Sequence, residues 1–132
     1  MKLNDLTYKI IGCAFEVHSI LGSGFQELIY QRALAIELDT QNIEYARELP
    51  MDIQYKGCVI GLRRVDFFIE NKVMVEIKAV SEVLPVHKAQ AINYCEAYEI
   101  TDGLLINFGS KKMQYHRVYN KNFISPEVTK KS

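Results

Sequence analysis

Two stretches near the start of the sequence repeat apolar residues every three or four positions, which is the period of an amphipathic α-helix. The apolar positions of the first stretch are Leu6, Ile10, Ala14, Val17 and Leu21. This stretch ends at Gly22-Ser23-Gly24, a run that favours a turn. A second helix is predicted over residues 26–41, with Ser23 and Gln26 as a capping box at its start. The chain therefore opens with two predicted helices.

In the middle of the chain the period changes to two, as expected for β-strands with one buried face. Pro50, Gly57 and Asn71 divide this region into three predicted strands of about five to nine residues. The clearest alternation covers residues 65–69 and 73–79. It places the valines, isoleucines and Phe67 on a core face, and carboxylates with a lysine on the other face.

The helical period returns after Pro85, and a third helix is predicted to extend to about residue 98. A short apolar strand over residues 103–108, a turn over residues 109–112 and a last strand over residues 113–119 follow. The predicted order of elements is ααβββαββ.

Length and composition indicate one folded domain. The chain has 132 residues, of which 48% are hydrophobic and 24% are charged, and this balance supplies enough apolar material for a core. We expect residues 1–122 to form the domain and residues 123–132 to form a flexible tail. No membrane span or secretory signal is recognisable, so a cytoplasmic protein without a membrane partner is expected. The three cysteines form no CxxC pair, which argues against a disulfide framework or a zinc site.

Charge is balanced overall, with 16 basic and 16 acidic residues, which argues against a protein that coats nucleic acid through bulk electrostatics. The balance hides a basic stretch over residues 103–132, in which Glu127 is the only acidic residue. Within this stretch Lys111, Lys112 and Arg117 are candidates for contacts with phosphate. A solvated basic tail is the alternative interpretation.

The turn between the second and third predicted strands determines which side chains share a face. A two-residue turn would expose half of the valines. A three-residue loop over residues 70–72 pairs Ile69 with Val73 and keeps the apolar side chains buried. The same register places Asp66 opposite Glu76.

The carboxylates of Asp66 and Glu76, with Lys78 two residues further along the same face, suggest metal-dependent chemistry. Adjacent carboxylates repel unless a proton or a cation lies between them, and their oxygens suit Mg²⁺ or Mn²⁺ rather than zinc. A nearby lysine would orient a water and stabilise charge on a phosphoryl group, as phosphodiester hydrolysis requires. The spacing alone does not separate this interpretation from a solvated sheet face with a Glu–Lys pair.

The same residues resemble a known nuclease signature. Asp66 followed by Glu76-Ile77-Lys78 resembles the PD-(D/E)xK motif, with Val65 where that motif has proline. Residues 24–30, with the sequence GFQELIY, match the motif of the GxxExxY family within that superfamily. The resemblance implies an α/β (α+β) fold with a restriction-endonuclease-like αβββαβ core, in which helices flank a mixed sheet.

Two later segments, residues 85–94 and 104–109, are also similar to the GxxExxY family and occur in the expected order. Gln90 and Tyr94 within the first of them are similar to the QxxxY element of RecB-like nucleases. The resemblance therefore covers most of the chain.

The resemblance implies a role for each residue of the signature. Asp66, Glu76 and the carbonyl of Ile77 would ligate Mg²⁺ or Mn²⁺. Lys78 would position the attacking water. Glu27 would be a further ligand or would hold a metal-bound water, although an acidic residue in the first turn of a helix also suits the helix dipole.

Gln90 is a further candidate catalytic residue, and Tyr94, His87 and Tyr30 are candidates for substrate binding. Gln90 and Tyr94 are four residues apart on the third predicted helix, so both can face one groove, and His87 precedes them by one turn. They would contact the metal-site carboxylate or a substrate phosphate, or form an ordinary helix surface with a half-buried tyrosine. Tyr30 would orient Glu27 or pack against the sheet.

The functional hypothesis is a metal-dependent nuclease that hydrolyses phosphodiester bonds, with DNA favoured over RNA. The alternative is an inactive nuclease-fold module that binds nucleic acid or a partner protein. Retention of Asp66, Glu76 and Lys78 together favours the enzyme. A homodimer or a partner protein is plausible, because a bare nuclease core offers little surface beyond its site.

Overall fold

The computed structural model describes residues 2–97, 100 and 102–119, and its elements follow the predicted order. The expected tail over residues 123–132, and the domain end at residue 122, lie outside the described residues. The elements are α1 (Leu3–Leu21), α2 (Glu27–Thr40), β1 (Tyr45–Tyr55), β2 (Cys58–Ile69), β3 (Val73–Lys78), α3 (Pro85–Ala97), β4 (Asp102–Asn107) and β5 (Gln114–Tyr119).

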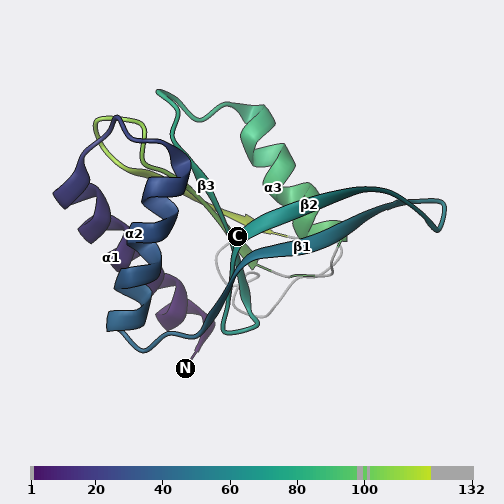
Figure 1. The fold of residues 1–132 in the computed structure, drawn as a ribbon, viewed down its shortest axis with the longest axis horizontal. Helices are drawn as coiled ribbons and strands as arrows, with labels where there is room; N and C mark the ends of the chain where they lie inside the picture. Colours follow the sequence, from purple (N-terminus) through teal and green to yellow (C-terminus); the bar gives the residue numbers. More distant parts are fainter. Residues whose placement is uncertain (1, 98–99, 101, 120–132) are drawn as a thin grey trace.

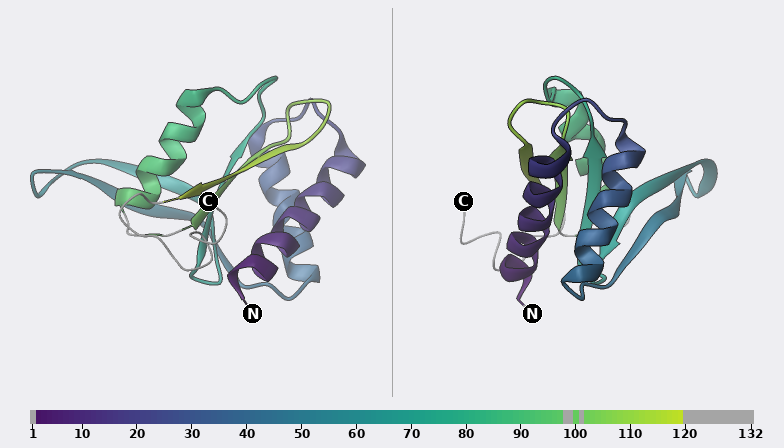
Figure 2. Two further views of the ribbon diagram at one scale, coloured as in Figure 1. Left: turned by 180° about the vertical axis from the view of Figure 1, so that it is seen from behind. Right: turned by 60° about the vertical axis from the view of Figure 1, so that its left-hand side comes forward.

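The strands form one mixed sheet in the order β1-β2-β3-β4-β5. Among the described strands, β3 and β4 are the parallel pair, and α3 lies in the crossover between them. The other neighbouring strands pair antiparallel. α1 and α2 pack on one side of the sheet and α3 packs on the other (Figure 1; Figure 2). This arrangement confirms the expected mixed sheet with flanking helices.

The apolar stripe predicted for the first helix is buried in α1. Leu6, Ile10 and Ala14 are fully buried, in the same core cluster as Leu34 of α2 and Phe67 of β2. Burial of such a stripe, rather than intrinsic helix propensity, supplies most of the stability of a surface helix. In the described part of the chain, no helix combines the length and apolar character needed to cross a membrane.

Strand β3 is buried on both faces, which differs from the polar face that the sequence predicts. Val73 and Val75 belong to the core under α1 and α2, whereas Met74 belongs to a second core that contains Cys95 of α3. Parallel pairing with β4 makes β3 a central strand, and the crossover helix covers its second face. Glu76 is consequently a buried carboxylate rather than a solvated one.

The loop between α1 and α2 is not held by the predicted capping box. Gln26 is the N-cap residue of α2, and its side chain makes no capping hydrogen bond. Instead, the Tyr30 hydroxyl donates to the carbonyl of Gly22 (2.6 Å) and accepts from the N–H of Phe25 (3.2 Å). The backbone at Gly24 has a φ of 123°, a conformation that favours glycine. Tyr30 therefore fixes the loop from inside the protein.

Strands β1 and β2 are longer than the sequence predicts. Pro50 does not end β1 but pairs with Arg64 within the ladder. An edge strand tolerates proline because its missing N–H can face solvent. The two strands form a hairpin that projects beyond the rest of the sheet (Figure 1).

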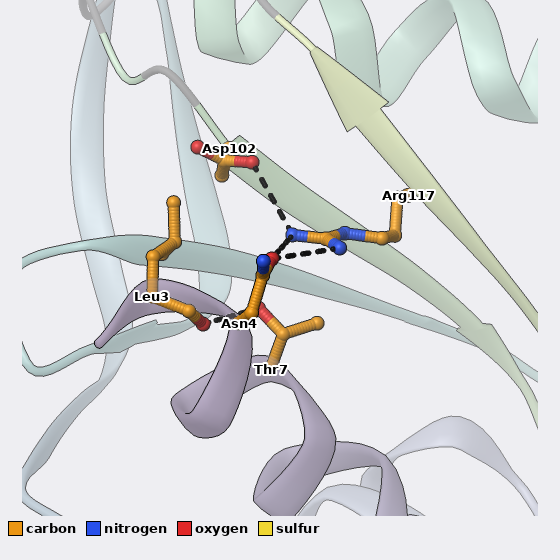
Figure 3. Close-up of polar contacts among 5 residues, drawn as sticks. All are labelled: Leu3, Asn4, Thr7, Asp102 and Arg117. Atoms are coloured by element: carbon orange, nitrogen blue, oxygen red, sulfur yellow. Dashed lines mark hydrogen bonds and ion pairs between the residues drawn. The ribbon is translucent and has the colours of Figure 1, made fainter. Parts of the chain in front are cut away.

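Arg117 of β5 links the start of α1 to the start of β4 (Figure 3). Both of its terminal nitrogens donate to Asn4 Oδ1 at 3.2 Å, and Nη2 lies 3.8 Å from Asp102 Oδ1. Asp102 is only 2% exposed. The phosphate contact suggested for Arg117 does not fit this position, because the guanidinium is already engaged within the protein.

Arg117→Met is expected to lower the free energy of unfolding by about 3 kcal/mol, because the buried Asp102 carboxylate loses the charge of Arg117 and Asn4 loses both hydrogen bonds from the guanidinium. Urea unfolding at neutral pH measures this loss. Arg32→Met, at an exposed position of α2, is the matched control and is expected to change stability by less than about 0.5 kcal/mol. Equal, small effects of the two substitutions would contradict a structural role for the Arg117 contacts.

Candidate active site

The observed register of β2 and β3 is the one that the burial pattern predicts. Ile69 pairs with Val73 and Phe67 pairs with Val75. The ladder ends there, one step before the predicted pair of carboxylates. The backbone N–H of Asp66 donates to Glu76 Oε1 at 3.4 Å, so the two acidic residues lie side by side at this point.

The carboxylate of Asp66 is held through both of its oxygens. The backbone N–H of Ile77 donates to Oδ2 at 2.7 Å, and Gln31 Nε2 donates to Oδ1 at 3.1 Å. Each carboxylate oxygen has two lone pairs, so both oxygens keep the capacity to accept a further ligand. Asp66 is thus fixed in orientation while it remains able to bind a cation.

The backbone opposite Asp66 departs from regular strand geometry. Glu48 has a φ of 49°, and it falls between the pairs Arg47–Phe67 and Leu49–Val65. Positive φ is unusual and strained for a residue other than glycine. Val65 packs in the core under α3, whereas Phe67 packs in the core under α1 and α2. The expectation that Val65 and Phe67 share one face is wrong, because they pack in different cores on either side of the irregular position where Glu48 of β1 lies opposite Asp66.

Glu76 carries the largest electrostatic cost in the site. Its pKa is raised from 4.5 to about 7, first by burial and then by the charge of the neighbouring Asp66. The hydrogen bond from the Asp66 backbone and the charges of Lys78 and Arg63 lower the pKa but do not offset the burial. A bound cation would favour the ionised carboxylate.

The pKa of Asp66 depends on its burial, its hydrogen bonds and the charges near it. Burial raises its pKa, whereas the hydrogen bonds from Ile77 and Gln31 lower it. Glu27 raises the pKa of Asp66 and Lys78 lowers it, so both side chains act on this carboxylate. Glu27 is the first residue of α2 and is exposed.

Asp66 and Glu76 therefore lie side by side, the charge of Lys78 acts on both, and the charge of Glu27, at the start of α2, acts on Asp66. Within the described residues, no three His, Cys, Asp or Glu side chains already surround one metal-sized position. Glu27 thus acts on Asp66 through its charge without completing a ligand set. Whether it is a ligand stays a prediction.

Two residues that the sequence analysis did not single out contact this cluster. Gln31 is 4% exposed and bonds Asp66, and Arg47 of β1 bonds Gln31. Gln31 follows Glu27 by four residues, so helical spacing from a candidate acid was a signal that could have found it. Nothing in the local sequence points to Arg47.

Asn107 braces the segment that follows Lys78. Its side chain accepts from the N–H of Val80 (2.9 Å) and donates to the carbonyl of Val80 (2.9 Å), while Phe108 N–H donates to the carbonyl of Lys78 (2.9 Å). Asn107 is fully buried. A Cβ at Gly109 would lie 2.4 Å from the backbone of residues 79 and 80, so this close approach requires glycine.

The residues predicted on α3 are placed differently from one another. Gln90 is half-buried, whereas Tyr94 is 6% exposed and belongs to the core under α3. The guanidinium of Arg63 lies over the ring of Tyr94 at 4.7 Å, a cation–π contact that the sequence did not reveal. His87 Nδ1 accepts from the N–H of Leu84 at 3.0 Å and so holds the turn before the helix.

Tyr30 and Lys112 have contrasting positions. Tyr30 is fully buried, and its ring stacks on Phe108 with centroids 4.7 Å apart. Direct contact between Tyr30 and a substrate, one of the predicted roles, does not fit this burial, whereas packing does. Lys112 is exposed in the β4–β5 loop, and its contact with substrate stays a prediction.

Comparison of the sequence with known families decides the relationship. The profile of the PD-(D/E)XK nuclease superfamily matches residues 4–118. The chain belongs to this superfamily. The resemblance to the superfamily signature is therefore confirmed.

A comparison with solved structures gives a more distant similarity. A solved structure titled "Crystal structure of SSO0001" is similar in fold, with a TM-score of 0.55 and 24% sequence identity. The similarity covers 70% of this chain and 49% of that one, so the present chain matches about half of that protein's length. No curated protein matches the sequence.

The residues present suit the divalent metals that PD-(D/E)XK nucleases generally use. Asp66 and Glu76 offer carboxylate oxygens, which are the hard donors that Mg²⁺ and Mn²⁺ prefer. Lys78 and Arg63 lower the pKa of Glu76 but do not offset its burial and the charge of Asp66. The donor set and its charge therefore fit a divalent cation.

Stability without divalent ions is expected to fall as the pH rises. The pKa of Glu76 is raised from 4.5 to about 7 in the folded state, so folding favours the protonated acid. The benefit is complete below about pH 4.5 and is lost as the pH passes about 7, for a total of about 3 kcal/mol. Urea unfolding in EDTA across this range measures the change.

Glu76→Gln is expected to remove this pH dependence, because a neutral amide replaces the titrating group. Glu16→Gln, at an exposed position of α1, is the control and should keep it. A wild-type profile that is flat or rises between pH 5 and 8, relative to Glu76→Gln, would contradict the raised pKa.

Proposed function

We propose that the chain is a metal-dependent nuclease that hydrolyses phosphodiester bonds in nucleic acid, with DNA as the expected substrate. The observation that carries the proposal is the carboxylate pair Asp66 and Glu76, with the charge of Lys78 acting on both. Superfamily membership supports the same activity.

Asp66, Glu76 and the carbonyl of Ile77 would hold Mg²⁺ or Mn²⁺. In an extended strand the N–H and C=O of one residue point to the same side. The Ile77 N–H is directed to Asp66, whereas the carbonyl of the next residue, Lys78, accepts from Phe108 on the opposite side. The Ile77 carbonyl is therefore expected on the Asp66 side.

Lys78 would act on the reacting groups rather than on the cation. A bound divalent ion would supply Lewis-acid polarisation of the phosphate and a more acidic water. The Lys78 ammonium would orient the attacking water and stabilise charge on the phosphoryl oxygens. Glu27 would bind the ion directly or hold one of its waters.

The finer assignment to the GxxExxY family is part of the proposal. Gly24 has the positive φ that favours glycine, the charge of Glu27 acts on Asp66, and Tyr30 anchors the loop before α2. Each named position of the motif thus has a physical role that supports the assignment.

Residues beyond the carboxylate pair would bind the nucleic acid. Gln90, on α3, would contact the site or a substrate phosphate, and His87 one turn earlier would lie at the same end of the helix. Lys112 would contact the phosphate backbone from the β4–β5 loop. Tyr94 would contribute indirectly, because its buried ring packs against the guanidinium of Arg63.

Lys78→Ala is expected to lower the cleavage rate by about 10²- to 10⁴-fold while Mn²⁺ binding is retained. Asp66→Ala is expected to lose both cleavage and Mn²⁺ binding. Cleavage is measured on labelled DNA and RNA, single- and double-stranded, with Mg²⁺ or Mn²⁺ and with EDTA as the blank. Mn²⁺ binding is measured by titration calorimetry.

Lys9→Ala, at an exposed position of α1, is the matched control and should cleave at the wild-type rate. Wild-type and Lys78→Ala proteins that cleave equally, with contaminating nuclease excluded, would remove Lys78 from the mechanism. Binding of nucleic acid without cleavage of any substrate would favour the inactive module instead.

A further inference from the structure

A chain of hydrogen bonds runs from the surface of β1 to the carboxylate of Asp66. Arg47 donates to Gln31 Oε1 through Nη2 at 2.8 Å and Nε at 3.2 Å. Gln31 in turn donates through Nε2 to Asp66 Oδ1 at 3.1 Å. Three elements, β1, α2 and β2, are thereby joined at one side chain of the candidate site.

The two ends of the Gln31 amide are fixed by their partners. Arginine carries only donors and an ionised carboxylate only acceptors, so the amide oxygen must face Arg47 and the nitrogen must face Asp66. Gln31 is 4% exposed, which shields both bonds from competing water. Two donors on one oxygen polarise the amide and strengthen its donation to Asp66.

Within the part of the chain that the structure describes, Arg47 has no competing acidic partner. It is exposed, and among the described residues no carboxylate lies within 4.0 Å of its guanidinium. Its two side-chain hydrogen bonds both go to the neutral amide of Gln31. The contact of this exposed arginine with the buried Gln31 is explained by the hydrogen bond that Gln31 donates to Asp66.

We propose that Gln31 and Arg47 are positioning residues for Asp66: they fix the direction of its carboxylate so that it presents its remaining lone pairs to the metal ion. The inference rests on the proposed function. Ile77 fixes Oδ2 and Gln31 fixes Oδ1, so removal of Gln31 leaves the carboxylate free to rotate. Partners of ligating carboxylates typically contribute about 10- to 100-fold to metal affinity.

Whether removal of Arg47 weakens or tightens metal binding distinguishes a positioning role from a purely electrostatic one. Removal of a positive charge near a cation site should tighten cation binding. Loss of a positioning bond should weaken it. Arg47→Met is therefore expected to weaken Mn²⁺ binding about 10-fold, against the direction that charge alone predicts.

Mn²⁺ titration of four proteins tests the inference: wild type, Arg47→Met, Gln31→Leu and the double variant. Both single variants are expected to weaken Mn²⁺ binding by similar factors, and the double variant is expected to be no worse than Gln31→Leu. Arg64→Met is the control, because Arg64 is an exposed arginine of β2 two residues before Asp66. It is expected to bind Mn²⁺ as tightly as wild type or more tightly.

Kinetic constants give a second measurement. A positioning role lowers kcat with little change in KM for nucleic acid. A direct contact between Arg47 and phosphate would instead raise KM and reduce the dependence of binding on salt. Melting temperatures identify any variant that is unfolded, and exposed Arg47 keeps the test valid if Gln31→Leu does not fold.

Each outcome is decisive. Wild-type Mn²⁺ binding with unchanged or tighter binding by Arg47→Met would overturn the inference and leave the proposed function standing. Additive losses in the double variant would also overturn it, because the two residues would then act independently. Absence of Mn²⁺ binding by the wild type would overturn the proposed function and this inference with it.

Discussion

The candidate site depends on the point at which β2 stops pairing with β3. Up to Phe67 the two strands form a regular antiparallel ladder, and beyond it β2 continues with β1 into the projecting hairpin. Asp66 is the first residue on the departing strand, and Glu76 lies beside it on the strand that stays in the sheet. Because the ladder has ended, the Ile77 N–H binds the Asp66 side chain instead of a neighbouring backbone.

The point at which β2 stops pairing with β3 carries a free-energy cost, and the surrounding residues offset part of it. Glu76 is buried next to a second carboxylate, and Glu48, opposite Asp66 on β1, has a positive φ. Lys78 and Arg63 act on Glu76 with favourable charge, and the Gln31 amide binds Asp66. Strain and unbalanced charge at one position are typical of a site that is organised for a ligand.

The sequence predicted the parts of the site that follow from local burial. The register of residues 65–77 was predictable because only one loop length keeps the valines, Ile69 and Phe67 inside, and one-residue slips invert every side chain. The order of elements followed from the change of period along the chain. The pairing of Ile69 with Val73 confirms this reasoning.

Contacts between residues far apart in the chain could not be predicted from the sequence. The burial of Glu76 depends on α3, which covers a face that alternation alone marks as solvated. The bond between Gln31 and Asp66 joins residues 35 positions apart, and the bond between Arg47 and Gln31 crosses from a strand to a helix. The loop before α2 failed as a capping box because Tyr30, a side chain inside the helix, supplied the bonds instead.

The separation of these partners along the chain has a consequence for folding. The two carboxylates belong to one hairpin, ten residues apart, and a hairpin of this size closes quickly. The groups that cover and orient them come from α2, far earlier, and from the parallel strand β4, which pairs only after α3 has crossed the sheet. Contacts between distant parts of a chain form slowly because loop closure costs entropy. The hairpin therefore cannot bury its acidic pair on its own, and the local and distant parts of the domain must become ordered together.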